Sequence, residues 1–103
     1  GTNDQTKGCN TKDFKARVDE LVTLVRDSYG SDVKILWIYD MMNFGKQDLV
    51  MSTLEAMGGE DAGLYTLKVT RNNDGGTSHP NFAAHCTVAK ELTDYINSKD
   101  LLY

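Results

Sequence analysis

Residues 33–40 read VKILWIYD, and this stretch decides the fold class. Its β-branched and aromatic side chains favour a strand, and every residue from Ile35 to Ile38 is apolar. A strand that is apolar on both faces is typical of a sheet that helices cover on both sides. We therefore expect residues 33–40 to form the central strand, with Trp37 buried between helices.

A helix is expected on each side of this strand in the chain. Apolar residues recur with a 3.6-residue period over residues 12–29, where Asn10 or Thr11 is available as the N-cap and Gly30 as the stop. The same periodicity, ended by a pair of glycines, predicts a second helix over residues 46–57. The local order is thus helix, strand, helix.

The second half of the chain adds a strand and one ambiguous segment. Residues 64–71 alternate between apolar and polar, which predicts an edge strand with one wet face, and the Asn, Asp and Gly of residues 72–76 predict a turn. Residues 81–88 fit either a third strand, paired as a hairpin, or a helix. We prefer the helix, because one apolar stripe continues for four turns. The stripe consists of Phe82, Cys86, Ala89, Leu92 and Ile96.

These elements predict an α/β or α+β fold in one small domain, residues 11–103, after a polar arm at residues 1–10. The order is α-β-α-β-α, with a short two- or three-stranded sheet covered by helices. Short links between the strands favour a parallel, right-handed crossover. Because two strands bury little, a third strand from residues 81–88, from residues 101–103 or from a second subunit would be no surprise, and a homodimer is left open.

Charge and hydropathy exclude some classes of partner. The 103 residues carry 11 Lys and Arg against 15 Asp and Glu, a net charge of −4, so no basic field exists to bind nucleic acid. No apolar run approaches the roughly 20 residues of a membrane span. A protein or a small polar ligand is the expected partner.

The two cysteines, Cys9 and Cys86, fit no redox or zinc spacing. If bridged, they close a loop over most of the chain, which is worth roughly 4–5 kcal/mol in the chain-entropy account. We expect this disulfide, and with it an extracytoplasmic (secreted or periplasmic) protein. The alternative is two unrelated thiols in a cytosolic protein.

Polar side chains follow both predicted strands. Asp40 and Asn43 come after the first strand, and Arg71, Asp74 and His79 come after the second. Parallel strands bring their carboxyl ends to one edge, where open α/β sheets bind ligands. We expect these five residues to face one cleft for a small polar ligand, with His79 changing protonation between pH 5 and 8. In the alternative these are ordinary wet loops, and His79 is held extended by Pro80.

Known cofactor and metal patterns are not met. Gly45-Lys46 before a helix lacks the upstream glycine and the Ser or Thr of a phosphate-binding loop. His85 and Cys86 point about 100° apart on a helix, so with His79 they make a poor metal or nucleophile site. We expect no cofactor and no metal.

Two stretches of the chain partly resemble known families. Residues 33–98, a β-α-β unit followed by a loop and a helix, resemble part of a thioredoxin fold, but residues 41–44 read MMNF where that family has CxxC, so redox activity is not implied. Residues 73–81, in which Asn-Asp-Gly-Gly is followed by Ser-His-Pro-Asn, are similar to a stretch of extracytoplasmic Cache-type sensor domains.

Three functions follow from these observations. The first is a small extracytoplasmic binding or interaction domain without catalytic activity. The second is a small enzyme or ligand sensor that uses the polar loops, with His79 as acid or base and Asp40 or Arg71 orienting the substrate. The third is a structural subunit that completes its sheet by association.

Overall fold

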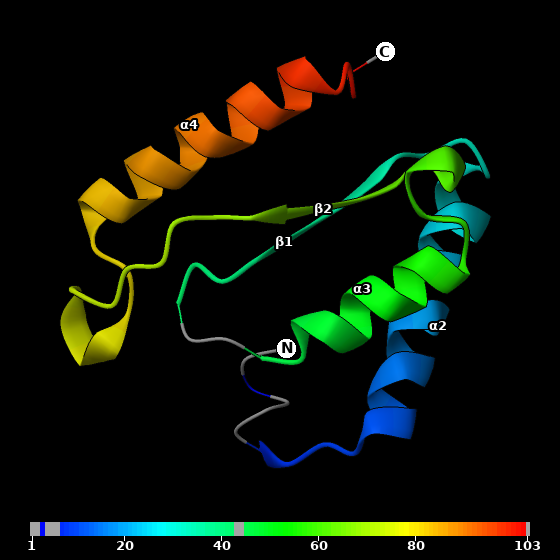
Figure 1. Ribbon diagram of the computed structural model, residues 1–103, viewed down its shortest axis with the longest axis horizontal. Coiled ribbons are helices and arrows are strands. Elements are labelled where there is room, and N and C mark those ends of the chain that lie inside the picture. Colours follow the sequence, from blue (N-terminus) through cyan, green and yellow to red (C-terminus); the bar gives the residue numbers. More distant parts are fainter. Residues whose placement is uncertain (1–2, 4–6, 43–44, 103) are drawn as a thin grey trace.

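The computed structural model describes residue 3, residues 7–42 and residues 45–102. These residues show the expected α-β-α-β-α order in a mixed α/β domain, with three helices and a two-stranded parallel sheet in the elements described below (Figure 1). Among the described residues, no helix combines the length and the apolar character needed to cross a membrane. The elements are α2 (Thr11–Tyr29), β1 (Ile35–Tyr39), α3 (Gln47–Ala56), the 3₁₀ turn η1 (Gly59–Ala62), β2 (Leu64–Lys68), the 3₁₀ turn η2 (Gly76–Ser78) and α4 (Phe82–Ser98).

The first helix forms where its periodicity predicts it. The side chain of Asn10 caps α2 by accepting a hydrogen bond from the backbone N–H of Asp13 at 2.9 Å. Gly30 ends the helix with a φ of 103°, a conformation that glycine adopts without strain. The buried stripe of α2, which includes Val18 and Val22, forms the main core with α3 and β2. The core residues are Phe14, Val18, Val22, Val50, Leu54 and Leu64.

The sheet positions the rest of the chain. β1 and β2 run parallel, with Ile35 opposite Leu64 and Tyr39 opposite Lys68. α2 and α3 lie side by side against one face of this sheet, and α4 lies along β2 on the other side (Figure 1). Both carboxyl ends of the strands therefore meet at one edge, as the short connections predict. Trp37 is partly exposed, contrary to expectation, because no further strand or helix covers the free edge of β1 within the described residues.

The 81–88 segment is helical, but α4 packs through a different face from the one predicted. Phe82 is 84% exposed and Cys86 is also exposed, whereas Ala84 and Val88 are buried. The Glu91 carboxylate further fastens α4 to the end of β2 by accepting hydrogen bonds from the backbone N–H and the hydroxyl of Thr70. The helix therefore meets the sheet through small side chains and a polar anchor.

The predicted disulfide is wrong for this structure, in which Cys9 and Cys86 are free thiols. Cys9 packs against the core formed by α2 and α3, whereas Cys86 lies on the exposed side of α4, beyond the other face of the sheet. A disulfide needs two Cα atoms within about 7 Å, whereas these two thiols belong to segments on different sides of the sheet. The extracytoplasmic expectation loses the support that it took from this bond.

Candidate functional site

The carboxyl end of the sheet carries an ion pair between the two strand ends. Asp40, directly after β1, has a side chain that is only 7% exposed. Arg71, after β2, donates to Asp40 Oδ1 through Nε at 3.0 Å and through Nη2, and Lys68 Nζ lies 3.8 Å from Oδ2. Asp40 also has a φ of 76°, which is uncommon for a residue other than glycine. The carboxylate is thus held and largely neutralised by cations from the neighbouring strand.

His79 lies in a loop that fixes its ring. The ring Nδ1 is 2.9 Å from the carbonyl oxygen of Thr77 and 3.0 Å from the Thr77 hydroxyl oxygen. The hydroxyl donates its own proton to the carbonyl of Gly76 at 2.7 Å, so both Thr77 oxygens can accept. Nδ1–H is therefore the donor, and the neutral ring keeps its lone pair on Nε2.

The backbone before His79 takes an unusual path. Thr77 and Ser78 have φ values of 54° and 60°, which place two successive residues in the left-handed region without a glycine. Such residues each cost about 1–3 kcal/mol and persist only where surrounding contacts hold them. Two backbone hydrogen bonds supply such contacts, Gly75 N–H to His79 O at 2.7 Å and His79 N–H to Gly76 O at 3.2 Å.

Asp40 and His79 line the same cavity, which we call the His79 pocket and which has a volume of about 400 Å³. A volume of this size is within the range of small-molecule sites. Its walls are mostly apolar, with a carboxylate and two imidazoles among them. The lining residues are Ile38, Tyr39, Asp40, Met41, Met42, His79, Pro80 and His85.

The structure brings some of the expected site residues together and leaves others apart. Asp40, Arg71 and His79 gather at the strand ends, Arg71 through its ion pair with Asp40. Asp74 instead turns back on its own loop, where its backbone N–H and its carboxylate bond to the side chain of Asn72. Asn43 lies outside the described residues.

Several contributors to the pocket were not predicted as site residues. His85 reaches it from the first turns of α4, and Pro80 closes it beside His79. The sequence shows His85 only as the second of two histidines, six residues after His79. Both line the pocket because α4 begins between them, at Phe82. In the described part of the chain, no group of three or more His, Cys, Asp or Glu side chains is placed to hold a metal ion.

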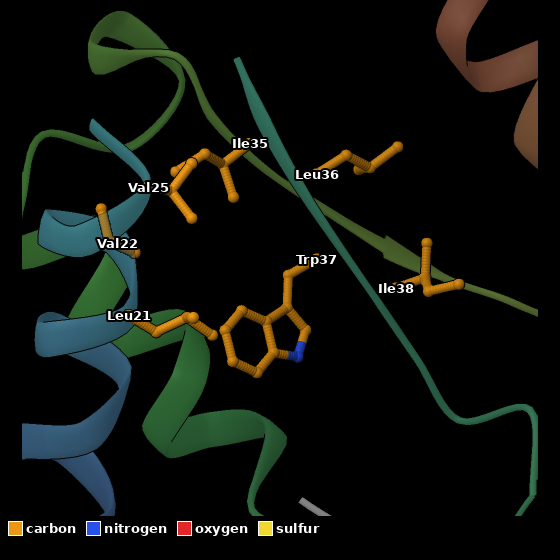
Figure 2. Close-up of a pocket in the computed structure, with 7 residues that line it drawn as sticks. All are labelled: Leu21, Val22, Val25, Ile35, Leu36, Trp37 and Ile38. Atoms are coloured by element: carbon orange, nitrogen blue, oxygen red, sulfur yellow. The ribbon is translucent and has the colours of Figure 1, made fainter. Parts of the chain in front are cut away.

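A second, apolar hollow follows the free edge of β1. This β1 groove, of about 340 Å³, lies between α2 and β1, with Ile35 and Trp37 turned toward α2 and Leu36 and Ile38 toward the other face (Figure 2). It contains no charged side chain. The lining residues are Leu21, Val22, Val25, Ile35, Leu36, Trp37 and Ile38.

Comparisons with known proteins suggest no ligand or activity for either cavity. No protein-family model, curated protein or solved structure matches this chain. The two partial resemblances noted from the sequence therefore receive no support from them.

Proposed function

We propose that this domain binds a small uncharged ligand in the His79 pocket and that His79 accepts a proton there from a hydroxyl group or a water molecule. The observation that carries the proposal is the fixed ring of His79 at the wall of a cavity. Nδ1–H is engaged by Thr77, so Nε2 is the nitrogen available to a ligand. A neutral imidazole with this tautomer is a general base.

The strained loop supports a functional role for this histidine. Left-handed residues at Thr77 and Ser78 cost stability, and such strain gathers at sites where a side chain must be held in one geometry. These residues and His79 are exposed, so the hydrogen bonds of the loop, rather than burial, hold the conformation. The strain thus favours the ligand-site hypothesis over the wet-loop alternative.

The charge of the pocket favours an uncharged ligand. The Asp40 carboxylate is already paired with Arg71 and Lys68, and the remaining walls are mainly Met, Ile, Tyr and Pro side chains. A charged ligand would lose its hydration here without gaining an unpaired counter-charge. A small ester or a similar acyl compound fits these walls and offers a carbonyl carbon to an activated water.

Hydrolysis of 4-nitrophenyl acetate tests the proposal. Water attacks the acetyl carbon, one of its protons passes to His79 Nε2, and the ester C–O bond breaks to release 4-nitrophenolate and acetic acid. The acetic acid and the His79 ring then lose their protons to the buffer. General-base catalysis contributes about 10²–10⁴-fold, so His79→Ala should lose most of the protein-dependent rate.

His85→Ala is the matched control, because His85 lines the same cavity without the Thr77 contact. It should keep the rate within a few-fold of the unmodified protein. Equal rates for His79→Ala and the unmodified protein, or equal losses in both variants, would refute the proposed role of His79.

The β1 groove favours a second candidate, a domain that associates through its sheet. The groove is apolar and lies at a strand edge that pairs with no other strand in the described part of the chain, and an added strand from a partner covers such an edge. Ile38→Lys would place a charge there, since Ile38 is 44% exposed. If the protein associates through this edge, light scattering should detect complexes of the unmodified protein and none of the Ile38→Lys variant. An unmodified protein that is monomeric at all concentrations argues against self-association.

A further inference from the structure

Asn72 occupies the centre of the loop that carries His79. Its side-chain Oδ1 accepts hydrogen bonds from two backbone N–H groups, that of Asp74 at 3.0 Å and that of Asn81 at 3.2 Å. Its own backbone N–H donates to the carbonyl of Met41 at 2.9 Å. One residue thus joins both ends of the loop at residues 72–81 to the chain segment that follows β1.

The segments that Asn72 joins are the walls of the His79 pocket. Met41 lines the pocket from the β1 side, and Pro80, the neighbour of Asn81, lines it from the α4 side. Asn81 in turn caps α4 by accepting from the backbone N–H of Ala84 at 2.9 Å. Asn72 therefore links the two walls, through its backbone N–H to Met41 and through its side-chain Oδ1 to Asn81.

We infer that Asn72 is the positioning residue for His79, holding the loop closed so that the Thr77 carbonyl faces the ring. This inference deepens the proposed function. The orientation of the ring does not depend on that function, whereas proton acceptance at Nε2 does. Asn72 touches neither the ring nor the cavity, so it acts through the backbone of the loop.

The expected effect of losing this oxygen follows from the strain in the loop. Without the bonds to Asp74 and Asn81, fewer hydrogen bonds oppose relaxation of Thr77 and Ser78 from the left-handed region, chiefly those within residues 75–79. Rotation at Thr77 turns its carbonyl away from Nδ1. The ring then loses the partner that fixes its tautomer, and Nε2–H becomes an alternative protonated form.

Nuclear magnetic resonance of the His79 ring nitrogens measures this tautomer directly. The unmodified protein should show the Nδ1–H form, and Asn72→Ala should show a mixture of both forms. Asn72→Asp combined with Asp74→Ala keeps an oxygen at the Oδ1 position without bringing two carboxylates together, and should restore the Nδ1–H form. Asp74→Ala, which removes only the carboxylate that accepts from Asn72 Nδ2, is the control and should leave the ring signals unchanged.

Amide hydrogen exchange tests the same hydrogen bonds, first in the unmodified protein, where no variant has to fold, and then in Asn72→Ala. The N–H groups of Asp74 and Asn81 should be protected, and Asn72→Ala should reduce their protection by about tenfold, the effect of one lost hydrogen bond. Unprotected amides in the unmodified protein overturn the inference. So does an Asn72→Ala protein that retains the Nδ1–H form.

Ester hydrolysis separates this inference from the proposed function. A tautomer that changes in Asn72→Ala, with no hydrolysis by any form of the protein, supports the positioning role and refutes the proposed chemistry. Hydrolysis that depends on His79 but not on Asn72, with unchanged ring signals, supports the chemistry and refutes the positioning role.

Discussion

Replacing Gly75 with alanine would test how tightly the His79 loop is packed. A Cβ atom at this position would lie 2.6 Å from His79 O, 2.7 Å from Pro80 O and 2.9 Å from Pro80 C. All three are backbone atoms, so no side chain can rotate aside, and the loop itself must move. The φ of Gly75 is −82°, which alanine adopts freely, so the steric contact alone accounts for the cost.

The size of the effect follows from two contributions. Overpacking of this kind costs about 1–3 kcal/mol, and the Gly75 N–H to His79 O hydrogen bond contributes about 0.5–1.5 kcal/mol that displacement of the loop would remove. We therefore expect Gly75→Ala to lower the free energy of unfolding by about 2–4 kcal/mol. Gly76 is the matched control, because a Cβ there meets no atom within 4 Å and its φ is not left-handed. Gly76→Ala should change stability by less than about 1 kcal/mol.

Urea unfolding followed by the fluorescence of Trp37, the single tryptophan, measures both variants. The ring signals of His79 then report whether the loop has moved. If Gly75→Ala is as stable as Gly76→Ala and its His79 signals are unchanged, the close packing of this loop is refuted.

Three other expectations concern the core, the pH dependence and the thiols. Leu54→Ala should cost about 2–5 kcal/mol in urea unfolding, because the side chain is 2% exposed within the main core; a loss below about 1 kcal/mol contradicts that placement. Burial raises the pKa of Tyr95, so the folded state holds the phenol proton more tightly than the unfolded state does. The free energy of unfolding should therefore fall as the pH rises above about 10, the ordinary pKa of tyrosine. Tyr95→Phe should reduce this fall, and an identical alkaline profile for the variant argues against the shift. Iodoacetamide should alkylate Cys86 quickly and the partly buried Cys9 slowly without a reductant, whereas modification only after reduction would indicate a disulfide.

Periodicity alone predicted most of the fold. The helices and strands lie within a few residues of their expected bounds, because the apolar stripe of residues 12–29 and the apolar run of residues 35–39 are local patterns. Parallel pairing also followed, since a helix connects the two strands. The face of α4 was predicted wrongly, because Ala84 and Val88 are small residues whose burial depends on how closely the helix approaches the sheet. The burial of Trp37 was also predicted wrongly, because periodicity does not show whether another element covers the edge of its strand.

The candidate site could be predicted only in outline. The carboxyl ends of parallel strands meet by geometry, so the approach of Asp40 to Arg71 was predictable from their positions in the sequence. The left-handed Thr77 and Ser78 were not, because turn chemistry signals positive φ through Gly, Asn and Asp rather than through hydroxyl residues. The expected disulfide failed for a related reason, since no sequence pattern reveals that its two cysteines lie on different sides of the sheet.

The free edge of β1 has a consequence for how the protein behaves at high concentration. Ile35 donates to Gly63 and Tyr39 accepts from Val69, so the backbone groups of these alternate residues face β2 and those of Leu36 and Ile38 face outward. Proteins usually protect such an edge with lysine, proline or a bulge, and this strand reads ILWIY. Repulsion between copies that each carry a net charge of −4 is then the main barrier to edge-to-edge pairing. Because salt shortens the range of that repulsion, to about 10 Å at 0.1 M, the colloidal stability of the protein depends on ionic strength more than its small charge suggests.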